Sequence, residues 1–171
     1  VPVGTTQELA NQYDSHSFAF CPERTIEGNA MEELISLPQI IGSNKEEVAE
    51  KARQFFEAFG ASRFSYTGIS EAEFAKLAAN AFRDVNFAFA NELALFGLQN
   101  NVDAYEAIRV SNLGYGRSRI PLPGITGGPC LSKDPLMVQA PIGDRSVIGS
   151  ARIMNQNSPK SFLESALRTA E

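Results

Sequence analysis

Several features on which common protein functions depend are scarce in this sequence. It has one histidine, His16, two cysteines, and no apolar run close to the roughly 20 residues that a membrane-spanning helix needs. A single histidine disfavours Ser-His-Asp and Cys-His hydrolases and leaves no cluster of metal ligands. Two cysteines are too few for a disulfide scaffold. A net charge of -5 disfavours a protein that binds nucleic acids non-specifically, because such proteins carry an excess of basic residues. We therefore expect a cytoplasmic protein that binds neither nucleic acid, membrane nor metal.

The two ends of the chain indicate a piece of something larger. The 171 residues suffice for one domain with a core, and their composition of 43% hydrophobic and 20% charged residues is typical of globular proteins. The chain opens with Val1-Pro2 and no initiator methionine. It finishes in an amphipathic run after Pro159, with no glycine as a helix stop signal. We expect an excised fragment or a truncated gene.

The first 69 residues mix short strand and helix patterns. Three short segments, bounded by turn residues, have the aromatic or β-branched composition of strands: 17–21, 38–41 and 63–67. A helix is predicted over 44–59, with Ser43 and Glu46 as a capping box and Gly60 at its C-terminal end. This alternation predicts the last αβ units of a larger, partly parallel sheet.

The rest of the chain is predicted to be helical and to centre on one long helix over 70–99. Ser70 and Glu73 form a second capping box at its start. One face is broad and apolar: Phe74, Leu77, Ala78, Phe82, Val85, Phe89, Leu93 and Phe96. A second face is made of small residues: Ala75, Ala79, Ala90, Ala94 and Gly97. A helix that is apolar on two sides is buried on two sides, either in a bundle or against a second subunit.

A polar stripe follows the same helix, and shorter elements come after it. The stripe holds Lys76, Asn80, Asp84 and Asn91, and the commonest explanation of such a stripe is a solvated edge. A short helix is predicted from Asp103 to Asn112, then a long Gly/Pro-rich loop over 113–129, then helices near Lys133 and from Asp144. A loop of that length inside a compact domain is usually functional or disordered.

Three small groups of residues could carry chemistry. Cys130 follows two glycines that allow close approach of a ligand, and it stands where the loop enters a helix, a setting that favours a thiolate. Lys76 and Asn80, four residues apart, share a helix face and could hold an oxyanion. Glu23 and Glu27 follow a strand end, where open αβ sheets bind ligands. Each group also has a plain structural explanation: a small buried thiol, a solvated pair and surface carboxylates.

Five segments, read together and in order, resemble the UDP-glucose/GDP-mannose dehydrogenase family over nearly the whole chain. They are Val1–Thr5, Cys21–Gly28, Glu71–Leu95, Pro123–Pro135 and Ala151–Pro159. The segments are similar, respectively, to the family's Val-Pro-Val-Gly-Thr motif, its Pro-Glu motif, its central helix, its catalytic loop and the helix that leads into its last domain. Any one of these motifs is weak evidence, whereas all five at credible spacing are specific.

The resemblance implies a fold and domain arrangement that is mainly α with an α+β start. Residues 1–69 would be the C-terminal portion of a Rossmann-like NAD-binding domain, and 70–171 a helical dimerisation domain that carries the catalytic loop. No Gly-x-Gly-x-x-Gly is present, so the dinucleotide-binding half would lie upstream and the C-terminal nucleotide-binding domain beyond Glu171. We expect the isolated chain to be inactive and to dimerise through the long helix.

The implied reaction is the NAD-dependent, two-step oxidation of a nucleotide sugar's C6 alcohol to a carboxylate. The resemblance makes Cys130 the nucleophile, Lys76 and Asn80 the oxyanion donors, Asp134 the residue that orients a water or lysine, and Glu23 the base for thioester hydrolysis. Glu27 and Lys133 would lie near the cofactor. The substrate would be bound by several of these residues and their neighbours: Glu23, Arg24, Glu27, Lys76, Asn80, Arg117, Thr126, Gly127 and Gly128.

The sugar and the activity itself each leave an alternative. Glu23-Arg24 is more like the UDP-N-acetylhexosamine branch, which serves polysaccharide biosynthesis, than the Pro-Glu-Phe of UDP-glucose enzymes. Pro129, however, departs from the His, Tyr or Ser that the family usually has before the cysteine, so UDP-glucose stays open. The rival functions are a non-catalytic helical dimerisation module and a β-hydroxyacid dehydrogenase, which needs no cysteine in a glycine-rich loop.

Overall fold

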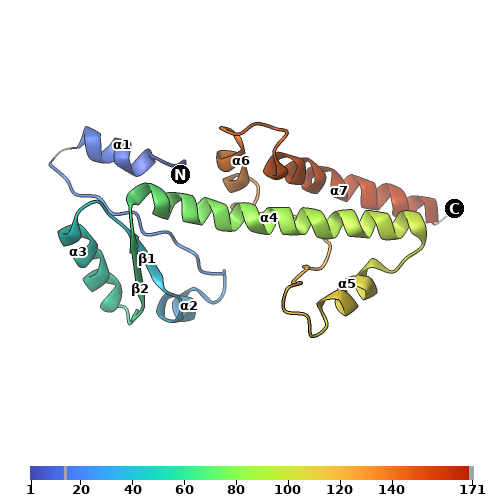
Figure 1. The fold of residues 1–171 in the computed structure, drawn as a ribbon, viewed down its shortest axis with the longest axis horizontal. Helices are drawn as coiled ribbons and strands as arrows, with labels where there is room; N and C mark the ends of the chain where they lie inside the picture. Colours follow the sequence, from blue (N-terminus) through green and yellow to red (C-terminus); the bar gives the residue numbers. More distant parts are fainter. Residues whose placement is uncertain (14, 170–171) are drawn as a thin grey trace. The chain divides into compact units, whose positions relative to one another are not determined.

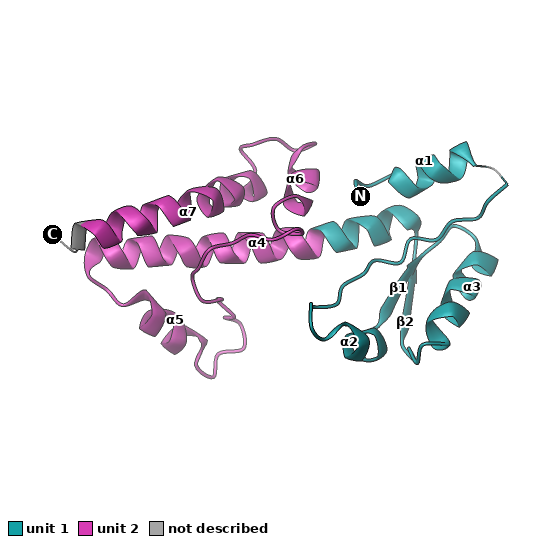
Figure 2. Cartoon of the chain, turned by 180° about the vertical axis from the view of Figure 1, so that it is seen from behind, with its two compact units in different colours: residues 1–77 teal, residues 78–171 magenta. Residues whose placement is uncertain are grey.

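The computed structural model describes residues 1–13 and 15–169 and divides the chain into two compact units, Val1–Leu77 and Ala78–Glu171 (Figure 2). The division falls inside the longest helix, α4, which spans Ile69–Asn100. The domains expected from the sequence, 1–69 and 70–171, therefore stay a prediction. No helix among the described residues is both long enough and apolar enough to cross a membrane.

The first unit is built on a parallel pair of strands (Figure 1). Its elements are α1 Thr5–Gln12, α2 Ala30–Ser36, β1 Gln39–Gly42, α3 Glu46–Glu57, β2 Phe64–Thr67 and the first turns of α4. The two strands pair in register from Gln39 opposite Phe64 to Gly42 opposite Thr67, and α3 connects them. The predicted αβ unit with a parallel sheet is thus confirmed, whereas α1 and α2 were not predicted as separate helices.

The predicted strand over 17–21 is wrong. Only Phe20 pairs there, in a single antiparallel bridge in which the N–H groups of Phe20 and Gly42 donate to each other's carbonyls at 2.8 and 2.9 Å. Pro22 follows and has no N–H with which to continue a ladder. Gly42 itself is needed for close packing, since a Cβ at that position would lie 2.5 Å from the Cβ of Ala72.

Both predicted capping boxes are also wrong. Helix α3 begins after Lys45, and Ser43 Oγ donates to the Lys45 carbonyl at 2.9 Å instead of capping the helix. Glu73, which is fully buried, accepts from Gly4 N (2.6 Å), Thr6 N (2.8 Å) and Thr6 Oγ1 (2.6 Å). The carboxylate therefore holds the start of the chain against α4. The predicted glycine after α3 is confirmed, because Gly60 has the left-handed φ of +92° that favours glycine.

The second unit is a helical assembly around the remainder of α4. It adds α5 Ala104–Asn112, α6 Asp134–Gln139 and α7 Val147–Thr169, and α7 lies along α4 (Figures 1 and 2). The side chain of Asp103 accepts from Tyr105 N and Glu106 N, which confirms the predicted start of α5. Over residues 1–13 and 15–169 the regular structure is one short parallel sheet and otherwise helices, so the fold is mainly α, as predicted.

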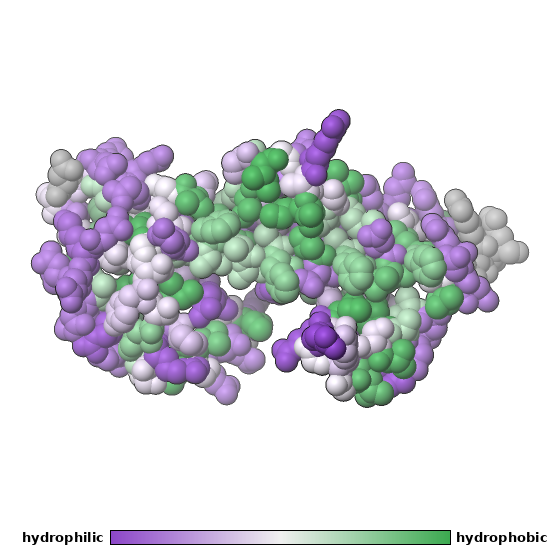
Figure 3. Space-filling model, viewed as in Figure 1, coloured by the Kyte–Doolittle hydropathy of each residue, from purple (hydrophilic) through white to green (hydrophobic). Residues whose placement is uncertain are grey.

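The later part of the small-residue face of α4 provides close packing within the second unit, whereas Ala75 and Ala79 are exposed. Ala90 is fully buried, Ala94 is 8% exposed, and a Cβ at Gly97 would lie 2.5 Å from the Val102 carbonyl. The phenylalanine face behaves differently, since Phe82 is 70% and Phe89 is 49% exposed. Figure 3 shows apolar residues gathered along the middle of α4. One of the two predicted apolar faces is therefore not covered by the described chain.

Candidate active site

Cys130 is exposed and lies in a series of turns at the end of the glycine-rich loop. Its carbonyl accepts from Asp134 N at 2.9 Å and from Lys133 N at 3.3 Å, and Ser132 N donates to the Gly128 carbonyl at 3.2 Å. Gly128 has a φ of +91°, so a glycine is required there by the backbone. The cysteine was predicted to stand where the loop enters a helix, but α6 begins four residues later, at Asp134. The thiol is therefore presented by a turn.

Asp134 is the centre of a polar cluster next to this turn. The residue is 1% exposed, accepts from Asn80 Nδ2 at its Oδ2 (2.7 Å) and from Lys133 Nζ at its Oδ1 (2.7 Å). Because a carboxylate only accepts, it fixes the orientation of the Asn80 amide and leaves that amide's second hydrogen for another acceptor. The hydrogen bond to Asp134 raises the pKa of Lys133, and the charge of Cys130 adds to the effect. Asn80, Asp134, Lys133 and the Cys130 turn are thus brought together in the second unit.

Glu23 and Lys76 interact in the first unit. Burial raises the pKa of Glu23, but the hydrogen bond from Thr25 N (2.6 Å) and the positive charge of Lys76 together outweigh burial, so the pKa of Glu23 is lowered. Glu23 is therefore a carboxylate at neutral pH. Arg24 turns to the backbone, where its Nη2 donates to the Pro38 carbonyl at 2.5 Å, and Glu27 is exposed.

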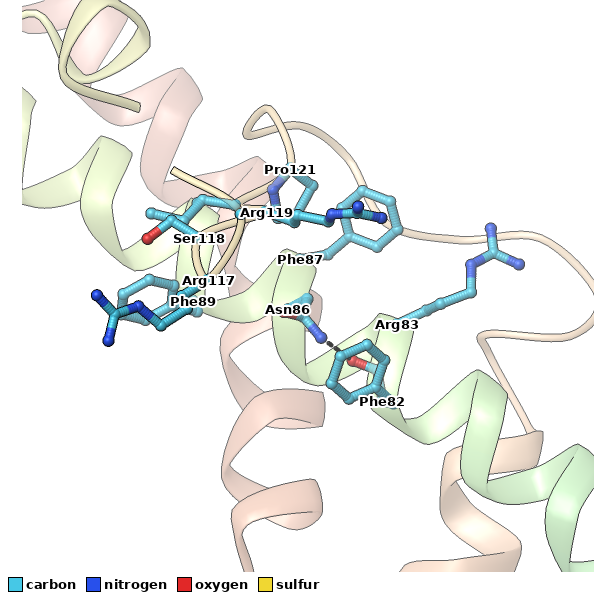
Figure 4. Close-up of a pocket in the computed structure, with 11 residues that line it drawn as sticks. Phe82, Arg83, Asn86, Phe87, Phe89, Arg117, Ser118, Arg119 and Pro121 are labelled. Atoms are coloured by element: carbon cyan, nitrogen blue, oxygen red, sulfur yellow. Dashed lines mark hydrogen bonds between the residues drawn. The ribbon is translucent and has the colours of Figure 1, made fainter. Parts of the chain in front are cut away.

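The remaining candidate residues lie in the loop of the second unit. Thr126 Oγ1 donates to the Gly124 carbonyl at 3.4 Å, and Gly127 has open space around its Cα. The Arg117 guanidinium lies 4.8 Å from the centre of the Tyr115 ring. Arg117 also lines a cavity of about 720 Å³ between the loop and the phenylalanines of α4 (Figure 4), and none of the cavity's residues belongs to the Asp134 cluster.

The polar stripe of α4 is not a solvated edge along its whole length. Asp84 and Asn91 are both 0% exposed, so the prediction is wrong for them. Their partners are Arg152 and Asn155 of α7, with which they form a buried hydrogen-bond network that reaches the loop. The sequence contained one sign of this network. Polar residues recur four and seven positions apart along α4, and Arg152 and Asn155, three positions apart, share a face of α7.

Residues 70–157 match the sequence profile described as the UDP-glucose/GDP-mannose dehydrogenase family, central domain. The chain belongs to this family. Among its relatives is the UDP-N-acetyl-D-mannosamine dehydrogenase of Pyrococcus horikoshii, 37% identical over 170 residues that cover 93% of this chain and 40% of the relative. The NDP-N-acetyl-D-galactosaminuronic acid dehydrogenase of Ralstonia nicotianae is 35% identical over 99% of this chain and 44% of its own length.

The fold also matches that of a solved UDP-sugar dehydrogenase. The structure of the UDP-D-ManNAc dehydrogenase from Pyrococcus horikoshii superposes with a TM-score of 0.89, at 36% sequence identity, over 99% of this chain and 44% of that chain. The present chain therefore spans about two fifths of the length of the curated relatives it matches.

Proposed function

We propose that this chain contributes the central region of an NAD-dependent nucleotide-sugar 6-dehydrogenase. The observation that carries the proposal is the exposed Cys130 beside the buried Asp134, which holds Asn80 and Lys133. The two relatives named above are dehydrogenases of N-acetylated sugar nucleotides, which favours a UDP-N-acetylhexosamine as substrate. UDP-glucose is the second candidate.

In the proposed reaction, Cys130 forms the covalent intermediates. The C6 hydroxyl loses its proton to solvent and a first hydride leaves C6 for the oxidant, NAD, which gives an aldehyde. The Cys130 thiolate then adds to the aldehyde carbon, and the carbonyl oxygen becomes the alkoxide of a thiohemiacetal. A second hydride leaves the same carbon, which gives a thioester. Water adds, the C–S bond breaks, and the thiolate leaves as the carboxylate product forms.

Asn80 and Lys76 stabilise the negative oxygen in these steps. The amide of Asn80 has one hydrogen bonded to Asp134 and a second that can donate to the alkoxide. Lys76, four residues earlier in α4, supplies a positive charge. Asp134 contributes by fixing the Asn80 amide before the substrate arrives, so that the donor does not have to reorganise during the reaction.

We assign Glu23 as the base for thioester hydrolysis, because it is ionised at neutral pH and can accept a proton from water; its lowered pKa makes it a weaker base than an ordinary glutamate. Arg24 and Glu27 serve substrate binding at the same edge of the first unit. The backbone of Thr126, Gly127 and Gly128 lies along the sugar, since two of these residues present no side chain that would block its approach.

The described residues fit a part of an NAD site. An exposed carboxylate such as Glu27 suits a ribose hydroxyl, and the Lys133 ammonium, whose side chain is 56% exposed, suits a phosphate or an amide oxygen. When bound, NAD would supply the hydride acceptor. The chain has no Gly-x-Gly-x-x-Gly motif for the pyrophosphate of the cofactor.

We also propose that the chain forms a homodimer through α4. Two exposed phenylalanines of this helix, Phe82 and Phe89, line the cavity of about 720 Å³ together with Arg117 and Arg119, as Figure 4 shows. An uncovered row of aromatic side chains on a packed helix is typical of an interface between subunits. In a dimer, Arg117 would face the second copy and reach an oxygen of the substrate bound there.

The test is an assay of the complete natural polypeptide that carries this sequence. Purified protein is incubated with NAD and either UDP-N-acetylmannosamine, UDP-N-acetylglucosamine or UDP-glucose, and NADH absorbance is followed together with mass spectrometry of the sugar nucleotide. We expect a uronic acid product from one N-acetylhexosamine. Formation of a 3-keto sugar, or oxidation of a β-hydroxyacid in place of any nucleotide sugar, would contradict the proposal.

A further inference from the structure

We propose that Asn91 and Arg152 are positioning residues that hold the two ends of the segment 124–131, which contains Cys130. The inference rests on the proposed function, because it assigns a role in placing that function's nucleophile. The inference does not depend on which sugar is the substrate, because Asn91 and Arg152 both lie outside the segment 124–131.

The upstream end of the segment is held from α4. Gly124 N donates to Asn91 Oδ1 at 2.8 Å, and Asn91 is 0% exposed. The other end of the same amide, Asn91 Nδ2, donates to Asn155 Oδ1 at 3.0 Å. An amide that is bonded at both ends cannot rotate, so the position of Gly124 is tied to that of two helices.

The downstream end is held from α7. Arg152 Nη1 donates to the Leu131 carbonyl at 2.5 Å and to Asp84 Oδ1 at 2.7 Å. Arg152 is 5% exposed and Leu131 is 7% exposed, so solvent does not compete for this bond. The residue immediately after Cys130 is thereby fixed by a buried cation.

Asn155 and Asp84 join the two anchors into one network. Asn155 Nδ2 donates to Asp84 Oδ1 and to the Asp84 carbonyl, both at 2.9 Å. Between the anchors, the hydrogen bonds that the structure shows for residues 125–130 are local and run to partners within 124–134. In the described part of the chain, the network therefore connects this segment to the packed helices at both ends, and at the downstream end the Cys130 carbonyl also accepts from Asp134 N of α6.

The network is poorly suited to a purely stabilising role. Asp84 Oδ2 and Arg152 Nε are buried and lack hydrogen-bond partners among the described residues. Buried ion pairs of this kind can often be replaced by apolar side chains without loss of stability. A displacement of about 1 Å in a reacting group, by contrast, can slow an enzyme about 100-fold. The presence of these buried polar atoms is explained if their function is to position the segment 124–131.

The test separates loop placement from stability in the complete natural polypeptide. The double variant Asp84→Leu/Arg152→Met removes both buried charges and releases the Leu131 carbonyl, and Asn91→Leu independently releases Gly124 N. Ser158→Ala is the matched control, because Ser158 is also buried on α7 but donates only to its own helix, to the Met154 carbonyl at 2.7 Å. The readouts are the thermal midpoint, amide hydrogen exchange, and kcat and KM measured separately.

We expect the double variant to unfold near the wild-type temperature while kcat falls about 100-fold and KM changes much less. Amide exchange should accelerate about tenfold or more at Gly124 in Asn91→Leu and at residues 132–134, whose amides donate to the Gly128 and Cys130 carbonyls, in the double variant, with α3 as an unchanged reference. Wild-type exchange and kcat in the folded variants would overturn the inference, as would a loss of kcat that only follows the loss of stability. A wild-type protein that oxidises no nucleotide sugar would instead refute the proposed function, and the exchange data would still decide whether the two anchors hold the loop.

Discussion

Replacing Asn80 should separate the structural and chemical contributions of the Asp134 cluster. Asn80 Nδ2 donates to Asp134 Oδ2 at 2.7 Å, and Asp134 is 1% exposed. Asn80→Ala takes one donor from a buried carboxylate that keeps Lys133 as a partner. A hydrogen bond to a charged group contributes about 1.5–3 kcal/mol, so we expect the free energy of unfolding to fall by about that amount.

Asn80→Asp is the sharper perturbation, because it places two carboxylates within hydrogen-bond distance. One of them must then stay protonated, so the pKa of the pair is raised. A group whose pKa is higher in the folded protein than in the unfolded protein stabilises the fold at pH values below its unfolded pKa. This stabilisation is lost as pH rises through its folded pKa. Urea unfolding at about pH 4 and about pH 8 should therefore show Asn80→Asp close to wild type at the lower pH and much weaker at the higher pH.

The catalytic effect of Asn80→Ala should exceed its effect on stability. Loss of a single oxyanion donor typically lowers kcat about 100- to 1000-fold, or about 2.7–4 kcal/mol. The assay is steady-state NADH formation, with Asn100→Ala as control, since the Asn100 side chain donates to the Phe96 carbonyl of its own helix and to no other described residue. If Asn80→Ala keeps full kcat, or if Asn80→Asp is as stable as wild type at both pH values, the geometry of the cluster does not have the role assigned to it.

Three further predictions concern other residues. Lys76→Ala should raise the activation free energy of hydride transfer by about 3 kcal/mol. The measurement is the isotope effect with substrate deuterated at C6, which should become larger; an unchanged isotope effect and rate would exclude this role of Lys76. The pKa of Glu23 is lowered in the folded protein, so ionised Glu23 stabilises the fold at pH values above its unfolded pKa, and this stabilisation is lost as pH falls through its folded pKa. The urea midpoints of wild type and Glu23→Gln should therefore converge in acid, and a difference that stays constant with pH would contradict this. The double variant Phe82→Ser/Phe89→Ser should convert dimer to monomer in light scattering, whereas Phe55→Ser, 60% exposed on α3, should not.

Local patterns in the sequence predicted part of the local structure, whereas the strand over 17–21 and both capping boxes were wrong. The side chain of Asp103 and the glycine at position 60 marked a helix start and a helix end because both act on their own neighbourhood. Cys130 was placed at the end of the glycine-rich loop from the glycines before it and the Lys-Asp-Pro after it, but at a helix entry and not in the turn that the structure shows. The parallel strand pair followed from two short segments separated by a helix.

Contacts between distant parts of the chain could not be predicted in this way. Glu73 has the spacing of a capping residue, but it binds Thr6, 67 residues away in the sequence. Asp84 and Asn91 are residue types that usually lie on the solvent-exposed face of a helix. They are buried here because α7 covers them and supplies Arg152 and Asn155 as partners. A polar residue's partners decide whether it is buried, and the partners here are 64 or more residues away.

The central claim is that Cys130 forms a covalent intermediate during two successive oxidations, and the most direct test is the number of NADH formed per sugar. In the complete natural polypeptide, wild type should yield two NADH for each sugar consumed and release a carboxylate. Cys130→Ser keeps nearly the same size and a hydroxyl but lacks the good nucleophile and leaving group, so net turnover to the acid should be lost while the protein stays folded and binds the nucleotide sugar. Full turnover by Cys130→Ser, with two NADH per sugar, would contradict the account.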